Sequence, residues 1–508
     1  MDGPKNIVIC SDGTGNTTIK ERGTNVFKIF EAVDIHGHTV NPCLTRQVAI
    51  YDDGVGTSNL KLLKLLGGAV GLGLGSNVKE LYAELARVFV PGDRIYLFGF
   101  SRGAFTVRAL AGLIVTCGII DRAKCNDDLC LKRYVDAAYS EYRRRYRTHQ
   151  SKYFRNPVDP QRAEDFRKQH AVVLELSAHE DRVLIDFIGV WDTVDAVGLP
   201  FAGLATVINN YIYRYKFPDL KLSLQVKKAC HALAIDDERL TFHPEMWDEE
   251  EESDGRIEQV WFPGVHANVG GGYPKQGMSL ISLYWMMRKA ELAGLRFSEY
   301  DCTFVRDHQH PFDKLYDSRA GGAVYYRYKP RDMELMCRKN HVVPKIHVSA
   351  VERIVQGTDG YAPGNIAAKI KIEFTDPHFS DLEAVPAIIE RALDPDRILL
   401  DRCRGRVLVR QACHVLLVGL SSVIFCLLVM KSVNESGGIV KGMWGLLNGN
   451  MLKVLFNLIK ELPLLVTLGI VSIVAAMVAV SLFARKRMKE EFSALWYKLH
   501  PALLRKLS

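Results

Sequence analysis

The sequence predicts an α/β protein with a doubly wound, mostly parallel sheet, followed by a C-terminal hairpin of two transmembrane helices. Two observations carry this prediction. In residues 1–401, short runs of Val, Ile and aromatic residues alternate with segments whose apolar residues recur every three or four positions. In the last quarter of the chain, two uncharged apolar runs have about the length that crosses a bilayer.

The predicted strands are apolar on both faces, which is typical of a parallel sheet covered by helices on both sides. They cover residues 6–10, 47–51, 94–100, 183–191 and 257–262. Helical spacing is found at residues 26–33, 76–89, 104–117 and 222–234. Residues 123–172 carry a charged stretch and are interpreted as an insertion outside the sheet.

Composition and charge exclude several classes of protein. Of the 508 residues, 48% are hydrophobic and 24% are charged, so wholesale disorder is not expected. The formal net charge is +8, and most of the excess lies in the C-terminal quarter, so no nucleic-acid partner is expected. The 11 cysteines show neither disulfide spacing nor paired CxxC ligands, which indicates a reducing compartment and no metal.

The two apolar runs, Ala412 to Met430 and Leu462 to Ala484, are predicted to span a membrane. Arginines in the juxtamembrane segment 402–411 precede the first run, and Arg485 to Lys489 follow the second. The positive-inside rule therefore places both ends in the cytoplasm. The start of the chain has no secretory signal pattern, so the N-terminal domain is expected to be cytoplasmic as well.

Two flanking segments have amphipathic patterns. The segment between the spans, residues 431–461, contains apolar residues that could form an interfacial helix. The basic tail, residues 485–508, has apolar residues at helical spacing, which fits a helix on an anionic leaflet or a helix packed on the N-terminal domain.

The sharpest motif is a G-x-S-x-G sequence, Gly99 to Gly103, placed between a predicted strand and a predicted helix. This is the context of a nucleophile elbow. Glycines are needed on both sides of Ser101 because the turn is so tight that a Cβ atom would clash. The turn pushes Ser101 out at the carboxyl edge of the sheet, beside a helix N-terminus that favours negative charge. We therefore predict that Ser101 is a nucleophile.

A serine nucleophile needs a histidine base and an orienting acid, in the chain order Ser, Asp, His. Asp192 directly follows a predicted strand and is the first candidate for the acid, with Asp195 and Asp236 as alternatives. His266 lies beyond another strand in a glycine-rich turn and is the candidate base. His231 competes, but it lies in a segment predicted to be helical, which favours a structural role.

When the serine attacks an ester, the carbonyl oxygen of the substrate becomes negative and needs hydrogen-bond donors. The N–H of Arg102, the residue after the nucleophile, is one expected donor. A glycine-containing loop follows the first strand, and the N–H of Gly13 is the second. The phosphate-loop pattern G-x-x-x-x-G-K-[ST] is absent, and no cofactor is expected.

Together these motifs resemble the α/β-hydrolase catalytic domain of type VI secretion phospholipase effectors and their uncharacterised relatives. The resemblance covers roughly residues 5–363, and it implies triad roles for Ser101, Asp192 and His266. The chain departs from the family pattern at Asn268 and Asp237. The matching motifs are Asp12 to Thr14 with Asn16, Gly99 to Ala104, Val190 to Val194, His231 to Asp237 and Phe262 to Tyr273.

The expected function is therefore a membrane-anchored serine hydrolase that cleaves acyl esters, with a membrane phospholipid or other lipid as substrate. The alternative is a non-catalytic membrane protein in which the hydrolase fold is a binding or assembly module and the hairpin acts on the bilayer. The three triad residues favour the enzyme. The sequence does not identify protein partners.

Overall fold

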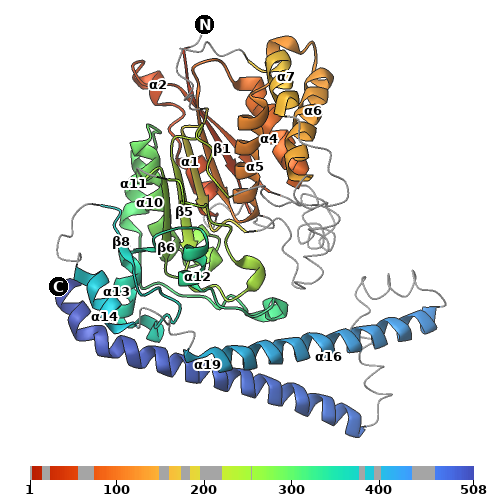
Figure 1. Cartoon of the computed structure of the whole chain (residues 1–508), viewed down its shortest axis with the longest axis vertical. Coiled ribbons are helices and arrows are strands. Elements are labelled where there is room, and N and C mark those ends of the chain that lie inside the picture. Colours follow the sequence, from red (N-terminus) through yellow and green to blue (C-terminus); the bar gives the residue numbers. More distant parts are fainter. Residues whose placement is uncertain are drawn as a thin grey trace.

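The structure is a computed structural model of the chain, and Figure 1 shows an α/β domain with two long C-terminal helices beside it. It describes residues 3–13, 23–54, 74–147, 160–172, 184–194, 220–252, 255–376, 384–393, 402–436 and 464–507.

The described strands form one sheet of eight, in the order β2-β1-β3-β4-β5-β6-β7-β8, and every neighbouring pair is parallel. The predicted α/β class with a parallel sheet is confirmed. The strands are β1 (Asn6–Ser11), β2 (Gln47–Asp52), β3 (Arg94–Phe100), β4 (Phe187–Trp191), β5 (Ala229–Ala234), β6 (Ile257–Phe262), β7 (Lys345–His347) and β8 (Lys371–Glu373).

Helices cover the sheet and fill the connections between its strands (Figure 1). The α-helices are α1 (Asn25–Ala32), α2 (Gly37–Val40), α4 (Leu74–Val88), α5 (Arg102–Cys117), α6 (Asp128–Arg147), α7 (Pro160–His170), α9 (His266–Gly270), α10 (Gly277–Leu292), α11 (Glu299–Asp307), α12 (Met333–Lys339), α13 (Val348–Gln356), α14 (Val385–Ala392), α16 (Arg404–Ser436) and α19 (Leu464–Leu507). Short 3₁₀ helices are η1 (Arg122–Lys124), η3 (Leu240–Phe242), η4 (Gly321–Tyr325) and η5 (Thr358–Gly360).

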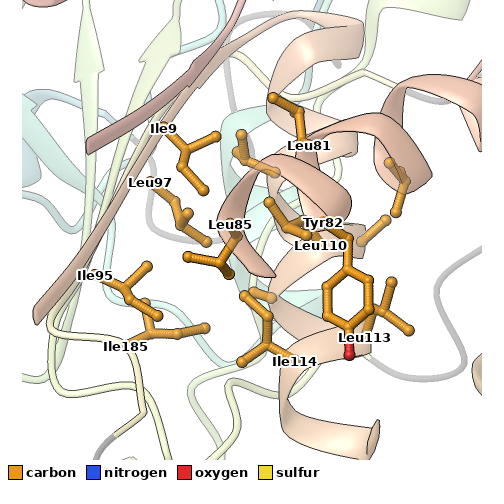
Figure 2. Close-up of a cluster of buried hydrophobic side chains, with 14 of the residues drawn as sticks. Ile9, Leu81, Tyr82, Leu85, Ile95, Leu97, Leu110, Leu113, Ile114 and Ile185 are labelled. Atoms are coloured by element: carbon orange, nitrogen blue, oxygen red, sulfur yellow. The ribbon is translucent and has the colours of Figure 1, made fainter. Parts of the chain in front are cut away.

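The sheet has a hydrophobic core on each face because successive strand residues point to opposite sides. Ile9 and Leu97 face the first core, where they meet Leu85 of α4 and Leu110 of α5 (Figure 2). The alternate residues, such as Phe98, pack on the other face against α1 and α10. The doubly wound arrangement predicted from strands that are apolar on both faces is therefore confirmed.

The predicted helix over residues 222–234 is wrong. The last six residues of that segment form β5, and residues 222–228 lie outside any helix. Alanine favours helices in isolation, but β5 lies between β4 and β6 and every one of its residues is buried. Here hydrogen bonds to two neighbouring strands override the local propensity. The short strands β7 and β8 were not predicted, because three residues carry too little pattern.

The two apolar runs lie in α16 and α19, which contact each other and run in opposite directions (Figure 1). Both helices are long and apolar enough to cross a membrane, with mean hydropathies of 2.5 and 2.2 over their most apolar windows. Their apolar side chains are largely exposed, which distinguishes them from the core helices. The connecting segment, with its possible interfacial helix, falls mostly on residues 437–463, which lie outside the described part.

The basic tail continues α19 without a break and packs on the α/β domain. Phe492, Trp496 and Leu503 are buried in a third hydrophobic cluster with residues of α13 and α14. The indole N–H of Trp496 donates to the carbonyl of Pro363 at 2.8 Å. Of the two readings of the tail, the structure has the packed helix, so this apolar face is not available to a lipid leaflet.

Candidate active site

The candidate catalytic residues come from loops at one edge of the sheet. Ser101 directly follows β3, Asp192 directly follows β4, and His266 is the first residue of α9, four residues after β6. Because all the strands are parallel, their carboxyl ends lie at the same edge. The strand order reverses between β1 and β3, where ligands of open α/β sheets bind.

The turn at Ser101 is strained. Its φ of 59° and ψ of −121° lie in a region that costs a non-glycine residue roughly 1–3 kcal/mol. A Cβ atom on Gly99 would lie 2.6 Å from the Cα of Ala104, and one on Gly103 would lie 2.1 Å from the carbonyl oxygen of Ser11. Both glycines are therefore needed for close backbone approach. The N–H of Ser101 donates to the carbonyl of Trp191 at 3.0 Å, which ties the turn to the end of β4.

His266 and Asp192 are hydrogen-bonded to each other. The imidazole Nδ1 lies 2.6 Å from Oδ2 of Asp192, and both side chains are buried. The ring packs at 4.6 Å from Phe100 and at 4.9 Å from Phe242, measured between centroids. Nδ1 donates to the carboxylate, so Nε2 is left as a proton acceptor. The Nε2 atom is buried and has no hydrogen-bond partner among the described residues.

Arg331 fixes the carboxylate of Asp192. Its two terminal nitrogens each lie 2.7 Å from a different carboxylate oxygen, and both side chains are fully buried. The N–H of Ala234 adds a third hydrogen bond at 3.0 Å. Burial alone would raise the pKa of Asp192, but the guanidinium and the bond to His266 hold this pKa well below its usual range. Asp192 is therefore a carboxylate at any physiological pH.

Burial lowers the pKa of His266, against the raising effect of Asp192. The imidazole is therefore neutral near pH 7 and has the protonation state of a general base.

The alternative acids behave differently. The carboxylate of Asp236 accepts from the N–H of Gly264 at 2.6 Å and from the hydroxyl of Tyr361 at 2.9 Å, and within the described residues it has no hydrogen bond to the imidazole of His266. Burial raises its pKa to about 7. Asp195 lies outside the described residues. Of the two candidates that the structure describes, Asp192 is the one hydrogen-bonded to His266.

His231 has a structural environment within β5. Its Nε2 accepts from the N–H of Thr193 at 3.1 Å, and its Nδ1 lies 3.4 Å from the side-chain oxygen of Gln259. Burial lowers the pKa of His231 to about 3, so it is neutral. By holding Thr193, it supports the turn that follows Asp192.

The two N–H groups expected to bind the oxyanion differ in whether they already have an acceptor. Arg102 is the first residue of α5, so its backbone N–H has no acceptor within the helix. The N–H of Gly13 donates to Oδ1 of Asp12 at 2.6 Å. The buried Asp12 also accepts from Thr24 at 2.5 Å and from Tyr51 at 2.8 Å. The Gly13 donor is therefore engaged by its own neighbour in this conformation.

Sequence reasoning missed Arg331 and gave Asp237 no role. Asp237 accepts a 3.3 Å hydrogen bond from the backbone N–H of His266 and pairs with Arg239 at 2.6 Å. No pattern marks Arg331, which lies in a loop 139 positions after its partner. The role of this buried arginine can be recognised only from the structure, which places its loop against the end of β4.

One group within the described chain has the donor set of a metal site: Asp248, Glu250 and His341, whose ligand atoms lie within 4.8 Å of one another. The group is largely exposed, and the hydrogen bond of 2.9 Å between Asp248 and His341 accounts for its geometry. It includes none of the residues around Ser101.

Comparison with known proteins identifies a family for the N-terminal part of the chain. The family described as T6SS, phospholipase effector Tle1-like, catalytic domain, matches residues 5–289. An uncharacterized protein of Saccharomyces cerevisiae, YEL023C, is 28% identical over 255 residues, which make up 47% of this chain and 32% of that protein. The chain therefore matches about a third of the length of this relative.

Two solved structures are similar in part. An uncharacterized protein from Pseudomonas aeruginosa has a TM-score of 0.34 at 18% identity, over 60% of this chain and 48% of that one. The Tle1 effector bound to the VgrG spike of the type 6 secretion system has a TM-score of 0.31 at 15% identity, over 63% of this chain and 78% of that one.

Removing the arginine partner of Asp192 should destabilise the domain. Arg331→Gln leaves a buried carboxylate without its bidentate partner, which costs about 3–5 kcal/mol in the free energy of unfolding. Denaturant unfolding followed by tryptophan fluorescence measures the loss. Arg338→Gln, on the exposed side of α12, is the matched control and should change stability by less than about 0.5 kcal/mol. Equal stability of the two variants would contradict the role of the pair.

Proposed function

The chain belongs to the family of type VI secretion Tle1-like phospholipase effectors through its catalytic domain, and on this premise we propose that it is a membrane-anchored serine hydrolase that cleaves acyl esters of membrane lipids. Ser101 is the proposed nucleophile, His266 the general base and Asp192 the residue that orients the base. The proposal requires no metal and no cofactor.

The observation that carries the proposal is the state of the His266 ring. Its Nδ1 is bound to a fixed carboxylate, and its buried Nε2 has no partner among the described residues. Phe100 packs against this ring in a tilted arrangement and is the residue directly before Ser101. A serine on a strained elbow, at the same sheet edge as an oriented, neutral imidazole, fits the arrangement that activates a hydroxyl group.

In the proposed reaction, Nε2 of His266 takes the hydroxyl proton of Ser101 while Oγ attacks the ester carbonyl carbon. The resulting imidazolium is stabilised by Asp192, which stays ionised because Arg331 holds it. When the tetrahedral intermediate collapses, the bond from the carbonyl carbon to the leaving alcohol breaks and His266 protonates that alcohol. Water, deprotonated by His266, then attacks the acyl carbon. The bond from this carbon to Oγ breaks, His266 returns the proton to Oγ, and the fatty acid is released.

The negative oxygen of the tetrahedral intermediate needs donors that are in place before it forms. We propose the N–H of Arg102 as the principal donor, because it starts a helix and lies next to the nucleophile. The N–H of Gly13 would contribute as the second donor by leaving Oδ1 of Asp12 for the substrate oxygen.

A lipid substrate is supported by the family and by the two C-terminal helices. If α16 and α19 cross a bilayer, the hydrolase domain is held at its surface, where lipid esters are the most abundant acyl esters. Cleavage there requires only two-dimensional diffusion of substrate. The domain organisation proposed from this is a catalytic domain over residues 1–401 and a hairpin with spans at 412–430 and 462–484.

Loss of the nucleophile should abolish hydrolysis. Ser101→Ala removes the attacking oxygen and should leave the fold and the membrane association unchanged, because the side chain makes no hydrogen bond within the described part of the chain. Release of fatty acid from a short-chain ester by the purified full chain measures the effect, and sedimentation with membranes is the control. Turnover that persists in the purified variant would reject the serine mechanism.

The alternative, a non-catalytic binding or assembly module, makes an opposite prediction for the same residue. A fluorophosphonate probe reacts with activated serines, so the enzyme should be labelled at Ser101 in enriched membranes. The binding module should not react with the probe at any detergent concentration. Lipid analysis of cells that express the wild type and Ser101→Ala would then identify the acyl chain and the headgroup.

The acid is tested by ranking three variants. If Asp192 orients His266, Asp192→Asn should lower kcat by roughly 10⁴-fold, as loss of the triad acid does in serine proteases. Asp236→Asn and Asp195→Asn should lower kcat much less. Circular dichroism of each variant separates lost chemistry from lost fold. A larger effect of Asp195→Asn than of Asp192→Asn would transfer the role to Asp195.

The two-span topology predicts where the ends of the hairpin lie. A reporter fused after Ser508 should be cytoplasmic, and single cysteines placed in residues 437–461 of a variant that lacks accessible cysteines should react with an impermeant thiol reagent from the opposite side. Positive residues precede the first span and follow the second, so they lie at the two outer ends of the hairpin. Positive residues favour the cytoplasmic side of a membrane, which is the physical reason for this orientation. Labelling of the loop and the tail from one side would reject two spans.

A further inference from the structure

A cavity of about 210 Å³ lies where α16 and α19 meet the α/β domain. One end is polar and the other is apolar, and the helices that form it run side by side (Figure 1). The polar lining consists of Asp317, Arg319, Arg410, His414 and Arg485, with Cys413 and Ser481 next to them.

Arginine side chains dominate the polar end. Arg410 pairs with Glu238 at 3.2 Å, and Arg485 pairs with Asp317 at 2.8 Å. Arg319 has no carboxylate within salt-bridge distance among the described residues, and it donates to the carbonyl of Val324 at 2.9 Å. Three guanidinium groups therefore face two carboxylates, which leaves one positive charge at this end.

Two guanidinium nitrogens near the polar end of the cavity have no hydrogen-bond partner in the described part of the chain. The Nε atoms of Arg319 and Arg410 are buried and have no hydrogen-bond partner among the described residues. Arg410 is only 5% exposed, and its guanidinium lies 3.7 Å from the ring centre of Tyr328, which holds it in place. Both terminal nitrogens of Arg410 are engaged by Glu238, at 3.2 and 3.3 Å, so the guanidinium of Arg319 is the one without a carboxylate partner within the described chain.

The opposite end of the cavity is lined by side chains that the proposed spans would place in the bilayer. They are Leu417, Val474, Met477, Val478 and Leu482. From Arg485 back to Val474 the helix rises about 16 Å, which is close to half of the roughly 30 Å hydrocarbon thickness. The apolar lining therefore extends through one leaflet, with the arginines at its headgroup level.

We propose that this cavity binds one anionic phospholipid, with its phosphate against Arg319 and Arg410 and an acyl chain along the groove between α16 and α19. Guanidinium groups bind phosphate oxygens through paired N–H donors, and the single excess positive charge matches a phosphodiester. The leaflet follows from the positive flanks, which place this end of the hairpin in the cytoplasm. The inference rests on the membrane anchoring proposed above and is independent of the hydrolase chemistry.

Native mass spectrometry of the full chain tests the site. Ser101→Ala protein, which should not cleave the probe, is incubated in detergent with phosphatidylglycerol or with phosphatidylcholine of the same acyl chains. We expect one phosphatidylglycerol to be retained in preference to phosphatidylcholine, and Arg319→Gln to weaken that preference by roughly fivefold. Arg487→Gln, exposed on the same helix as Arg485 and outside the cavity, is the matched control and should keep the preference.

A second pair of variants tests the apolar end without changing charge. Val478→Trp should fill the groove and reduce lipid retention, whereas Val471→Trp, on α19 but outside the cavity lining, should not. Equal retention of the two lipids by the wild type, or an unchanged preference in Arg319→Gln, would overturn the site. Displacement of the lipid by an excess of inorganic phosphate would assign the arginines to free phosphate and overturn the lipid.

The same samples separate this inference from the proposed function. Alkaline extraction that releases the chain from membranes would overturn both the anchoring and the lipid site. An anchored chain without headgroup preference would overturn the lipid site alone. Fluorophosphonate labelling of the Arg319→Gln variant with Ser101 intact should match the wild type, because Arg319 is not part of the proposed catalytic machinery.

Discussion

The buried ion pair between Asp192 and Arg331 is the interaction on which the candidate site depends. Placing two charges inside a protein is unfavourable unless they are paired and hydrogen-bonded, and here each carboxylate oxygen receives a guanidinium N–H. Arg331 also donates to the backbone carbonyls of Ala234 and Phe242. The pair therefore fixes the end of β4, the end of β5 and the 3₁₀ helix η3, whose Phe242 contacts the His266 ring.

Backbone strain at the same edge supports this arrangement. Ser101 and Asp192 both have positive φ, which is unusual for residues other than glycine. The two strained turns follow neighbouring strands and are joined by the hydrogen bond from Ser101 to Trp191. Such conformations persist where surrounding contacts fix them, and they are concentrated at functional sites. The sheet and the ion pair supply those contacts.

The elements that were predicted correctly are those that a short stretch of sequence determines by itself. The tight turn at Ser101, the first three strands and the two long apolar helices are marked by glycine spacing, by apolar runs and by the absence of charge. The segment that forms β5 was predicted to be a helix because its alanines favour helices. Its conformation is instead determined by pairing with the neighbouring strands β4 and β6. Arg331 could not be predicted, because its role exists only through a contact between distant segments. The hydrogen bond of Gly13 to Asp12 was likewise not readable from the motif.

The central claim is that His266, oriented by Asp192 and Arg331, activates Ser101 toward an acyl carbon. An experimental structure of the full chain after reaction with a fluorophosphonate tests it most directly. The account predicts a bond from phosphorus to Oγ of Ser101, a phosphoryl oxygen that accepts from the N–H of Arg102, and Nε2 of His266 within hydrogen-bonding distance of the adduct. Phosphorus on another residue, or an unmodified Ser101 beside an intact His266–Asp192 pair, would contradict it.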